Sequence, residues 1–65
     1  MKEEDRPVAV FSDQNGNVFN LIGIARRALK EAGYREEAEE MTAKVQKSRS
    51  YDEALAVMNE YVDVE

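Results

Sequence analysis

The sequence contains no cysteine and no histidine among its 65 residues. Without cysteine the chain forms no disulfide bond, and without either residue type it builds no Cys/His zinc site and no nucleophile paired with an imidazole. A chain of this length lies near the lower limit at which one hydrophobic core supports folding, and here neither disulfides nor zinc assist. Association is the remaining way to bury more surface, so we predict a homo-oligomer.

Long apolar runs are also absent. No run approaches the roughly 20 residues that a membrane-spanning helix requires, and residues 1–6 are charged where a secretory signal becomes apolar. Positive charge is scarce, since 9 Lys and Arg residues face 14 Asp and Glu residues for a net charge of -5. Duplex binding depends largely on cations that neutralise phosphates. We therefore expect a cytoplasmic protein that binds neither membranes nor duplex nucleic acid.

The N-terminal part of the chain predicts a disordered leader followed by one strand. Residues 1–6 are charged and bury nothing, which favours disorder. Residues 8–11 form a β-branched and aromatic run that is too short for a helix. A lone strand must pair with something, and the candidates are the C-terminal residues 61–64 or the same strand of another subunit. The second option makes Val8, Val10 and Phe11 candidate interface residues.

Residues 18–32 carry apolar side chains at steps of three and four, which predicts the amphipathic helix around which the chain is organised. Phe19 extends the apolar surface towards the opposite side of this helix, so it joins the candidate partner interface. Asn17 is the expected N-cap, and Gly33 is expected to end the helix in a left-handed conformation. The expected inner stripe consists of Val18, Ile22, Ala25 and Leu29.

Two further helices are predicted at residues 35–47 and 51–61. The first has a thin apolar stripe with acidic residues early and lysines late, and the second is preceded by a capping box formed by Ser50 and Glu53. The expected fold is therefore mainly α, with one short N-terminal β-strand followed by a compact three-helix domain over residues 7–65.

The polar strip of the first predicted helix consists of Gly23, Arg26, Arg27 and Lys30. Three cations within little more than one turn suit a phosphate, a nucleotide or an acidic partner, and a glycine in mid-helix allows close approach. The alternative, which the pattern favours, is a solvated helix face in which Arg27 pairs with Glu31. The strip is nevertheless the candidate ligand-binding site.

No catalytic or metal site is predicted. Neighbouring carboxylates such as Glu36 and Glu37 diverge on a helix and are expected to be exposed, which does not favour acid-base catalysis. The segment from residue 13 begins like a calcium-binding loop, but Val18 and Ile24 stand where that loop needs glycine and glutamate. A turn that caps a helix explains the same residues without an ion. We predict a protein with no enzymatic activity and no cofactor.

The order of GNVFNLIGIARRALKEAG at residues 16–33, a Glu-rich helix, SYDEAL and a closing YVDVE resembles a loose family of small uncharacterised phage and prophage proteins. The resemblance implies a stoichiometric inhibitor of host machinery or a sponge for nucleotide signals. We therefore predict a non-enzymatic interaction module that acts on a host protein partner. The alternatives are an oligomeric sponge that binds a phosphate-bearing nucleotide through Arg26, Arg27 and Lys30, and an acidic DNA mimic, for which the scattered carboxylates give little support.

Overall fold

The computed structural model describes residues 1–12 and 17–65. Residues 13–16, which hold the turn expected before the first helix and the start of the calcium-loop candidate, lie outside the described residues. The described elements, in chain order, are a 3₁₀ turn η1 (Glu3–Asp5), a strand β1 (Val8–Ala9), the helices α1 (Val18–Glu31), α2 (Arg35–Gln46) and α3 (Tyr51–Asn59), and a strand β2 (Asp63–Val64). The prediction of a mainly helical fold with three helices and a short N-terminal strand is confirmed.

The helix ends are set by the residues that the sequence indicates. Asn17 caps α1, because its side chain accepts a hydrogen bond from the Phe19 N–H at 2.9 Å. Gly33 follows with a φ of 92°, and the Tyr34 N–H then donates back to the Leu29 carbonyl at 2.8 Å. Ser50 caps α3 by accepting from the Glu53 N–H at 3.1 Å. The three helices therefore begin within one residue of their predicted positions.

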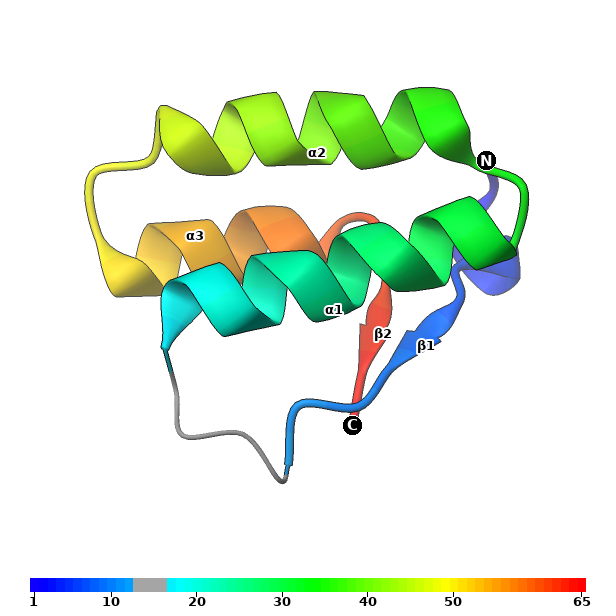
Figure 1. The fold of residues 1–65 in the computed structure, drawn as a ribbon, viewed down its shortest axis with the longest axis horizontal. Coiled ribbons are helices and arrows are strands. Elements are labelled where there is room, and N and C mark those ends of the chain that lie inside the picture. The colour runs from blue at the N-terminus through cyan, green and yellow to red at the C-terminus, as the bar shows by residue number, and fades with distance from the viewer. Residues whose placement is uncertain (13–16) are drawn as a thin grey trace.

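The helices pack around one core, to which each of them and the C-terminal segment contribute. In Figure 1 α2 lies above α1 and α3, and the two strands lie below them. The largest fully buried side chains are Leu29, Met41 and Met58, one from each helix, and Val62, which lies between α3 and β2. The core therefore ties the end of the chain to the helices.

The buried side of α1 differs from the expected stripe. Its buried residues are Leu21, Ala25 and Leu29, whereas Val18 and Ile22 are only partly buried. The difference has a physical cause, because Val18 and Ile22 face a hollow at the N-terminal end of α1. That hollow is described below.

The N-terminal strand pairs within the chain. β1 runs parallel to β2, with Val8 opposite Asp63 and Ala9 opposite Val64. The C-terminal candidate for the pairing is thus the one observed. The strand is shorter than the predicted residues 8–11, although the Phe11 N–H continues the pairing by donating to the Glu65 carbonyl just after β2, which also accepts from the Ser12 N–H.

Residues 1–6, the leader that the sequence predicts to be disordered, make contacts with the rest of the chain. Arg6 donates through Nη1 to the Asn59 carbonyl at 2.7 Å, and its Nη2 lies 3.3 Å from Asp63 Oδ1. A guanidinium group is well placed there, because carbonyls at a helix C-terminus lack intrahelical donors and carry partial negative charge. Arg6 therefore joins the leader to the end of α3 and to β2.

In the described part of the chain, no helix is long and apolar enough to span a bilayer.

Candidate functional site

The predicted ligand strip forms one surface. Gly23, Arg26, Arg27 and Lys30, together with Glu31, line a shallow depression of about 350 Å³ on α1. All four predicted ligand residues are therefore brought together by the helix, as their spacing indicates.

Each cation of this strip lies next to a carboxylate. Arg26 Nη2 is 2.6 Å from Glu39 Oε1, and Lys30 Nζ is 3.7 Å from the same oxygen. The hydrogen bond from Arg26, with a smaller contribution from the charge of Lys30, holds the pKa of Glu39 below its ordinary value. Arg27 Nε bonds Glu31 Oε1 at 2.8 Å, the pairing that the solvated-face interpretation expects. A bound anion would therefore compete with two carboxylates.

Gly23 is not required by its surroundings. A Cβ added at this position would meet no heavy atom of the described residues within 4 Å. Glycine in mid-helix nevertheless lowers helix stability relative to alanine. The strip thus contains open space above α1 that the described part of the chain does not use.

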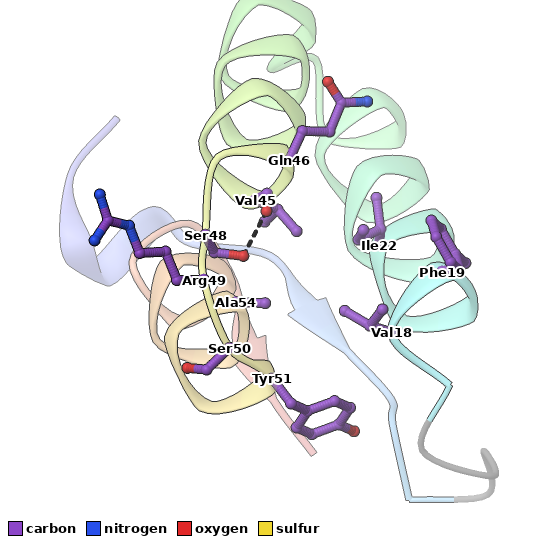
Figure 2. Close-up of a pocket in the computed structure, with 10 residues that line it drawn as sticks. All are labelled: Val18, Phe19, Ile22, Val45, Gln46, Ser48, Arg49, Ser50, Tyr51 and Ala54. Carbon is purple, nitrogen blue, oxygen red and sulfur yellow. Dashed lines mark hydrogen bonds between the residues drawn. The ribbon is translucent and has the colours of Figure 1, made fainter.

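A second hollow, of about 430 Å³, lies where the first turns of α1 face the end of α2 and the start of α3 (Figure 2). We call it the α1–α3 groove. Its lining residues are Val18, Phe19, Ile22, Val45, Gln46, Ser48, Arg49, Ser50, Tyr51 and Ala54.

The interior of the α1–α3 groove is apolar. Val45 and Ala54 are buried, and Figure 2 shows Val18 and Ile22 facing them across the hollow. The side chain of Arg49 points away from the hollow in the same view. No other charged residue belongs to the lining, so the groove offers apolar contacts rather than ionic ones.

Two aromatic side chains border the α1–α3 groove. Phe19 is 79% exposed and Tyr51 is 44% exposed, so both remain accessible to a partner, Phe19 more than Tyr51. Two nearby serines form hydrogen bonds at helix ends. Ser48 Oγ donates to the Val45 carbonyl near the end of α2, and Ser50 Oγ caps α3 by accepting from the Glu53 N–H. These bonds fix the backbone from which Tyr51 projects.

The predicted interface residues do not share one surface. Phe19 borders the α1–α3 groove, whereas Val8 and Val10 are exposed at the strand pair and do not line it. Phe11 is partly buried against the core, so only part of its side chain is accessible to a partner. Tyr51 is a lining residue of the groove that the sequence analysis does not single out. Its place directly after the Ser50 cap, at the exposed first position of a helix, is the signal that indicates its role at the rim.

A third cluster joins α2 to the residues after α3. Tyr61 Oη donates to Glu40 Oε1 at 2.6 Å, and Lys44 Nζ lies 3.5 Å from that oxygen and 5.3 Å from the Tyr61 ring centroid. Burial raises the pKa of Tyr61, and the hydrogen bond from Tyr61 lowers the pKa of Glu40. Both shifts move the pKa values further from pH 7, whereas the pKa values of catalytic acids and bases are shifted towards the working pH. The cluster therefore fastens the end of α3 to α2.

Comparison with protein-family models, with curated proteins and with solved structures found no match. Within the described residues, no three acidic side chains come together as they would around a metal ion. The function is therefore inferred from the geometry of the two surfaces of α1.

Proposed function

We propose that this chain is a small non-enzymatic protein-interaction module that binds one protein partner at the α1–α3 groove. The observation that carries the proposal is the exposure of Phe19, which is 79% accessible at the border of an apolar hollow. Exposed aromatic side chains beside an apolar depression are typical of interface centres, where they fill pockets or accept a partner's side chain. An aromatic residue of this exposure contributes little to folding, so binding is its best-supported role.

The charges around the groove indicate what kind of segment fits it. Asp52 and Glu53 follow Tyr51 in the first turn of α3, are exposed, and make no ion pair within the described part of the chain. The interior accepts apolar side chains, and these two carboxylates, which follow the lining residue Tyr51 without lining the groove themselves, attract positive charge beside it. A segment with an apolar face flanked by lysine or arginine matches both features. The simplest such segment is a basic amphipathic helix.

The resemblance to small phage proteins extends the proposal. A phage protein of this size that acts stoichiometrically would use the groove to cover a functional surface of a host protein. The chain's net charge of -5 adds a long-range attraction towards a basic partner surface.

A pair of synthetic peptides tests the occupant. Both carry the same leucine pattern of an amphipathic helix, with lysine at the polar positions of one and glutamate at those of the other. We expect fluorescence anisotropy to show tighter binding of the lysine peptide, with a preference that weakens as salt rises. Phe19→Ser is expected to weaken binding by about tenfold or more, as loss of an interface centre does.

The matched control is Ala43→Ser, which changes an exposed position of α2 outside the groove. Its binding should equal that of the unchanged protein. The proposal is wrong if neither peptide binds, or if Phe19→Ser binds the lysine peptide as tightly as the control does. A photo-reactive phenylalanine analogue at Phe19 then identifies the natural partner, with the same analogue at position 43 as the control.

The second candidate is a sponge for a phosphate-bearing nucleotide at the strip of Gly23, Arg26, Arg27 and Lys30. It is supported by the convergence of these residues on one depression, and it is weakened by the carboxylates of Glu39 and Glu31 beside the cations. A panel of mono-, di- and cyclic nucleotides should raise the melting temperature if this candidate holds, and Arg26→Ala with Arg27→Ala should remove the rise. An unchanged melting temperature across the panel contradicts it. The DNA-mimic alternative has less support, because several of the exposed carboxylates already lie next to cations, namely Glu3, Glu31, Glu39, Glu40 and Asp63.

A further inference from the structure

The strand β1 has one edge that no described element covers. β1 lies beside β2 (Figure 1), and the pairing uses the Pro7 carbonyl, which accepts from the Asp63 N–H at 2.9 Å, and the Ala9 carbonyl, which accepts from the Glu65 N–H at 2.9 Å. In a parallel ladder alternate residues point their backbone groups to opposite edges. The N–H and C=O groups of Val8 and Val10 therefore point away from β2, and within the described residues none of them has a hydrogen-bond partner.

This open edge lacks the features that usually protect an edge strand. Natural edge strands carry charged side chains, an inserted proline or a bulge that prevent association. Residues 8–11 are uncharged, and the side chains of Val8 and Val10 are 51% and 50% exposed. Pro7 does not block the edge, because its backbone groups lie on the β2 side. An uncharged strand with exposed valines and unpaired backbone groups is suited to accept another strand.

We propose that the open edge of β1 binds the β1 strand of a second copy of this chain, antiparallel about a two-fold axis at Ala9. The register follows from the backbone groups. In an antiparallel pair, residues that exchange both hydrogen bonds lie directly opposite each other. Val8 therefore faces the partner's Val10, and Val10 faces the partner's Val8. The product is a four-stranded sheet in the order β2, β1, partner β1, partner β2.

Charge favours a second copy at this edge over the opposite edge of the sheet. β2 carries Asp63 and is followed by Glu65, so pairing through β2 would bring the carboxylates of two acidic chains together. Pairing through β1 leaves those carboxylates on the outermost strands and places only uncharged residues opposite each other, Val8 against Val10 and Ala9 against Ala9. Like charges directly opposite each other destabilise strand pairs, whereas β-branched pairs stabilise them.

The size of the interface sets the expected strength. The paired segment is short, so it buries less surface than the roughly 1,200 Å² of a stable complex. We expect the dimer to have a dissociation constant of roughly 100 µM, so its free energy of association is much weaker than that of a nanomolar complex. The dimer surface does not include the α1–α3 groove, so the failure of one proposal leaves the other standing.

The first test uses the unchanged protein. Sedimentation equilibrium from about 10 µM to about 1 mM should show a reversible monomer–dimer equilibrium. Amide hydrogen exchange over the same range should slow at Val8 and Val10 by about tenfold or more as the dimer forms. The amides of Asp63 and Glu65 bond within the chain and should be protected at every concentration. A monomer throughout, or a dimer without slower exchange at Val8 and Val10, overturns the proposal.

The second test examines the register with matched charge variants. Val8→Lys with Val10→Lys places like charges opposite each other and should abolish the dimer. Val8→Glu with Val10→Lys places opposite charges there and should retain it. Ala43→Lys with Ala56→Lys adds the same charge at exposed positions of α2 and α3 and should also retain it. Circular dichroism verifies that each variant is folded. Dimerisation by the double-lysine variant at Val8 and Val10, or its loss in the opposite-charge variant, overturns the proposed register.

Discussion

The two exposed surfaces of α1 differ in how far the chain itself satisfies them. The polar strip has the higher density of charge, yet Arg26 and Lys30 share Glu39, and Arg27 pairs with Glu31. The α1 residues that line the α1–α3 groove carry no charge, and Phe19 among them is 79% exposed. A cluster of cations in a sequence is therefore weaker evidence for a ligand site than an apolar side chain that folding leaves exposed.

The largest expected effect comes from truncating a core side chain that holds α1 against the rest of the fold, because both surfaces depend on the position of α1. Leu29 is fully buried, so Leu29→Ala should lose about 2–5 kcal/mol from the free energy of unfolding. That loss is comparable with the roughly 3–5 kcal/mol that a core of this size supplies, so the variant should be largely unfolded. Urea denaturation followed by circular dichroism measures the change.

Phe19→Ala is the matched control, because it truncates a larger apolar side chain on the same helix at an exposed position. Surface substitutions of this kind change stability by less than about 0.5 kcal/mol. A destabilisation by Phe19→Ala as large as that by Leu29→Ala would show that Phe19 belongs to the core. The contrast between the two surfaces would then not hold.

An intermediate effect is expected at the rim of the groove. Ser50→Ala removes the acceptor of the Glu53 N–H and should cost about 1 kcal/mol, the usual contribution of an N-cap. Ser50→Asp keeps an acceptor at the same position and should retain most of the stability. Thermal melting compares the three proteins. If Ser50→Ala melts at the unchanged temperature, the cap does not fix the start of α3, and Tyr51 is not held at the rim by it.

A smaller effect of opposite sign is expected in the strip. Gly23→Ala fills open space in mid-helix and should stabilise the chain by about 0.5–1 kcal/mol. Gly33→Ala is the matched contrast and should destabilise it, because Gly33 has a φ of 92° that alanine adopts only with strain. Urea denaturation separates the two. A loss of stability in Gly23→Ala would show that a close approach at the strip requires glycine.

Much of the fold could be predicted because its signals are local. The caps at Asn17 and Ser50 and the left-handed Gly33 depend on residues within a few positions, and all three are observed. The exact buried side of α1 was not predictable, because Val18 and Ile22 fit the apolar period as well as Leu21 does. Which of these side chains is covered depends on where α2 ends and α3 begins.

In the candidate site, too, local features could be predicted from the sequence, whereas contacts between distant parts of the chain could not. The strip residues lie within two turns of one helix, so their convergence could be predicted from spacing alone. Their neutralisation by Glu39 could not, because that carboxylate comes from α2 and is 13 residues from Arg26. The α1–α3 groove was missed for a related reason, since its walls come from three helices that meet only in the folded chain. The anchoring of the leader through Arg6 and Asn59 likewise joins opposite ends of the sequence.

The smallest expected effect concerns the carboxylate that neutralises the strip. Because the pKa of Glu39 is lowered in the folded chain, its ionised form adds stability above the unfolded pKa, and this contribution is lost as the pH falls through the lowered pKa. Glu39→Gln should therefore melt slightly below the unchanged protein at pH 7, and the gap should close in acid and shrink in high salt.

The matched control for this prediction is Glu36→Gln, which removes an exposed carboxylate of α2 that makes no ion pair within the described residues. Its melting temperature should not show the same dependence on pH and salt. Glu39→Gln also frees Arg26 and Lys30, so inorganic phosphate should stabilise this variant more than the unchanged protein. Equal stabilisation of both would mean that Glu39 does not occupy the strip in solution, and the strip would then be an available anion site rather than a satisfied surface.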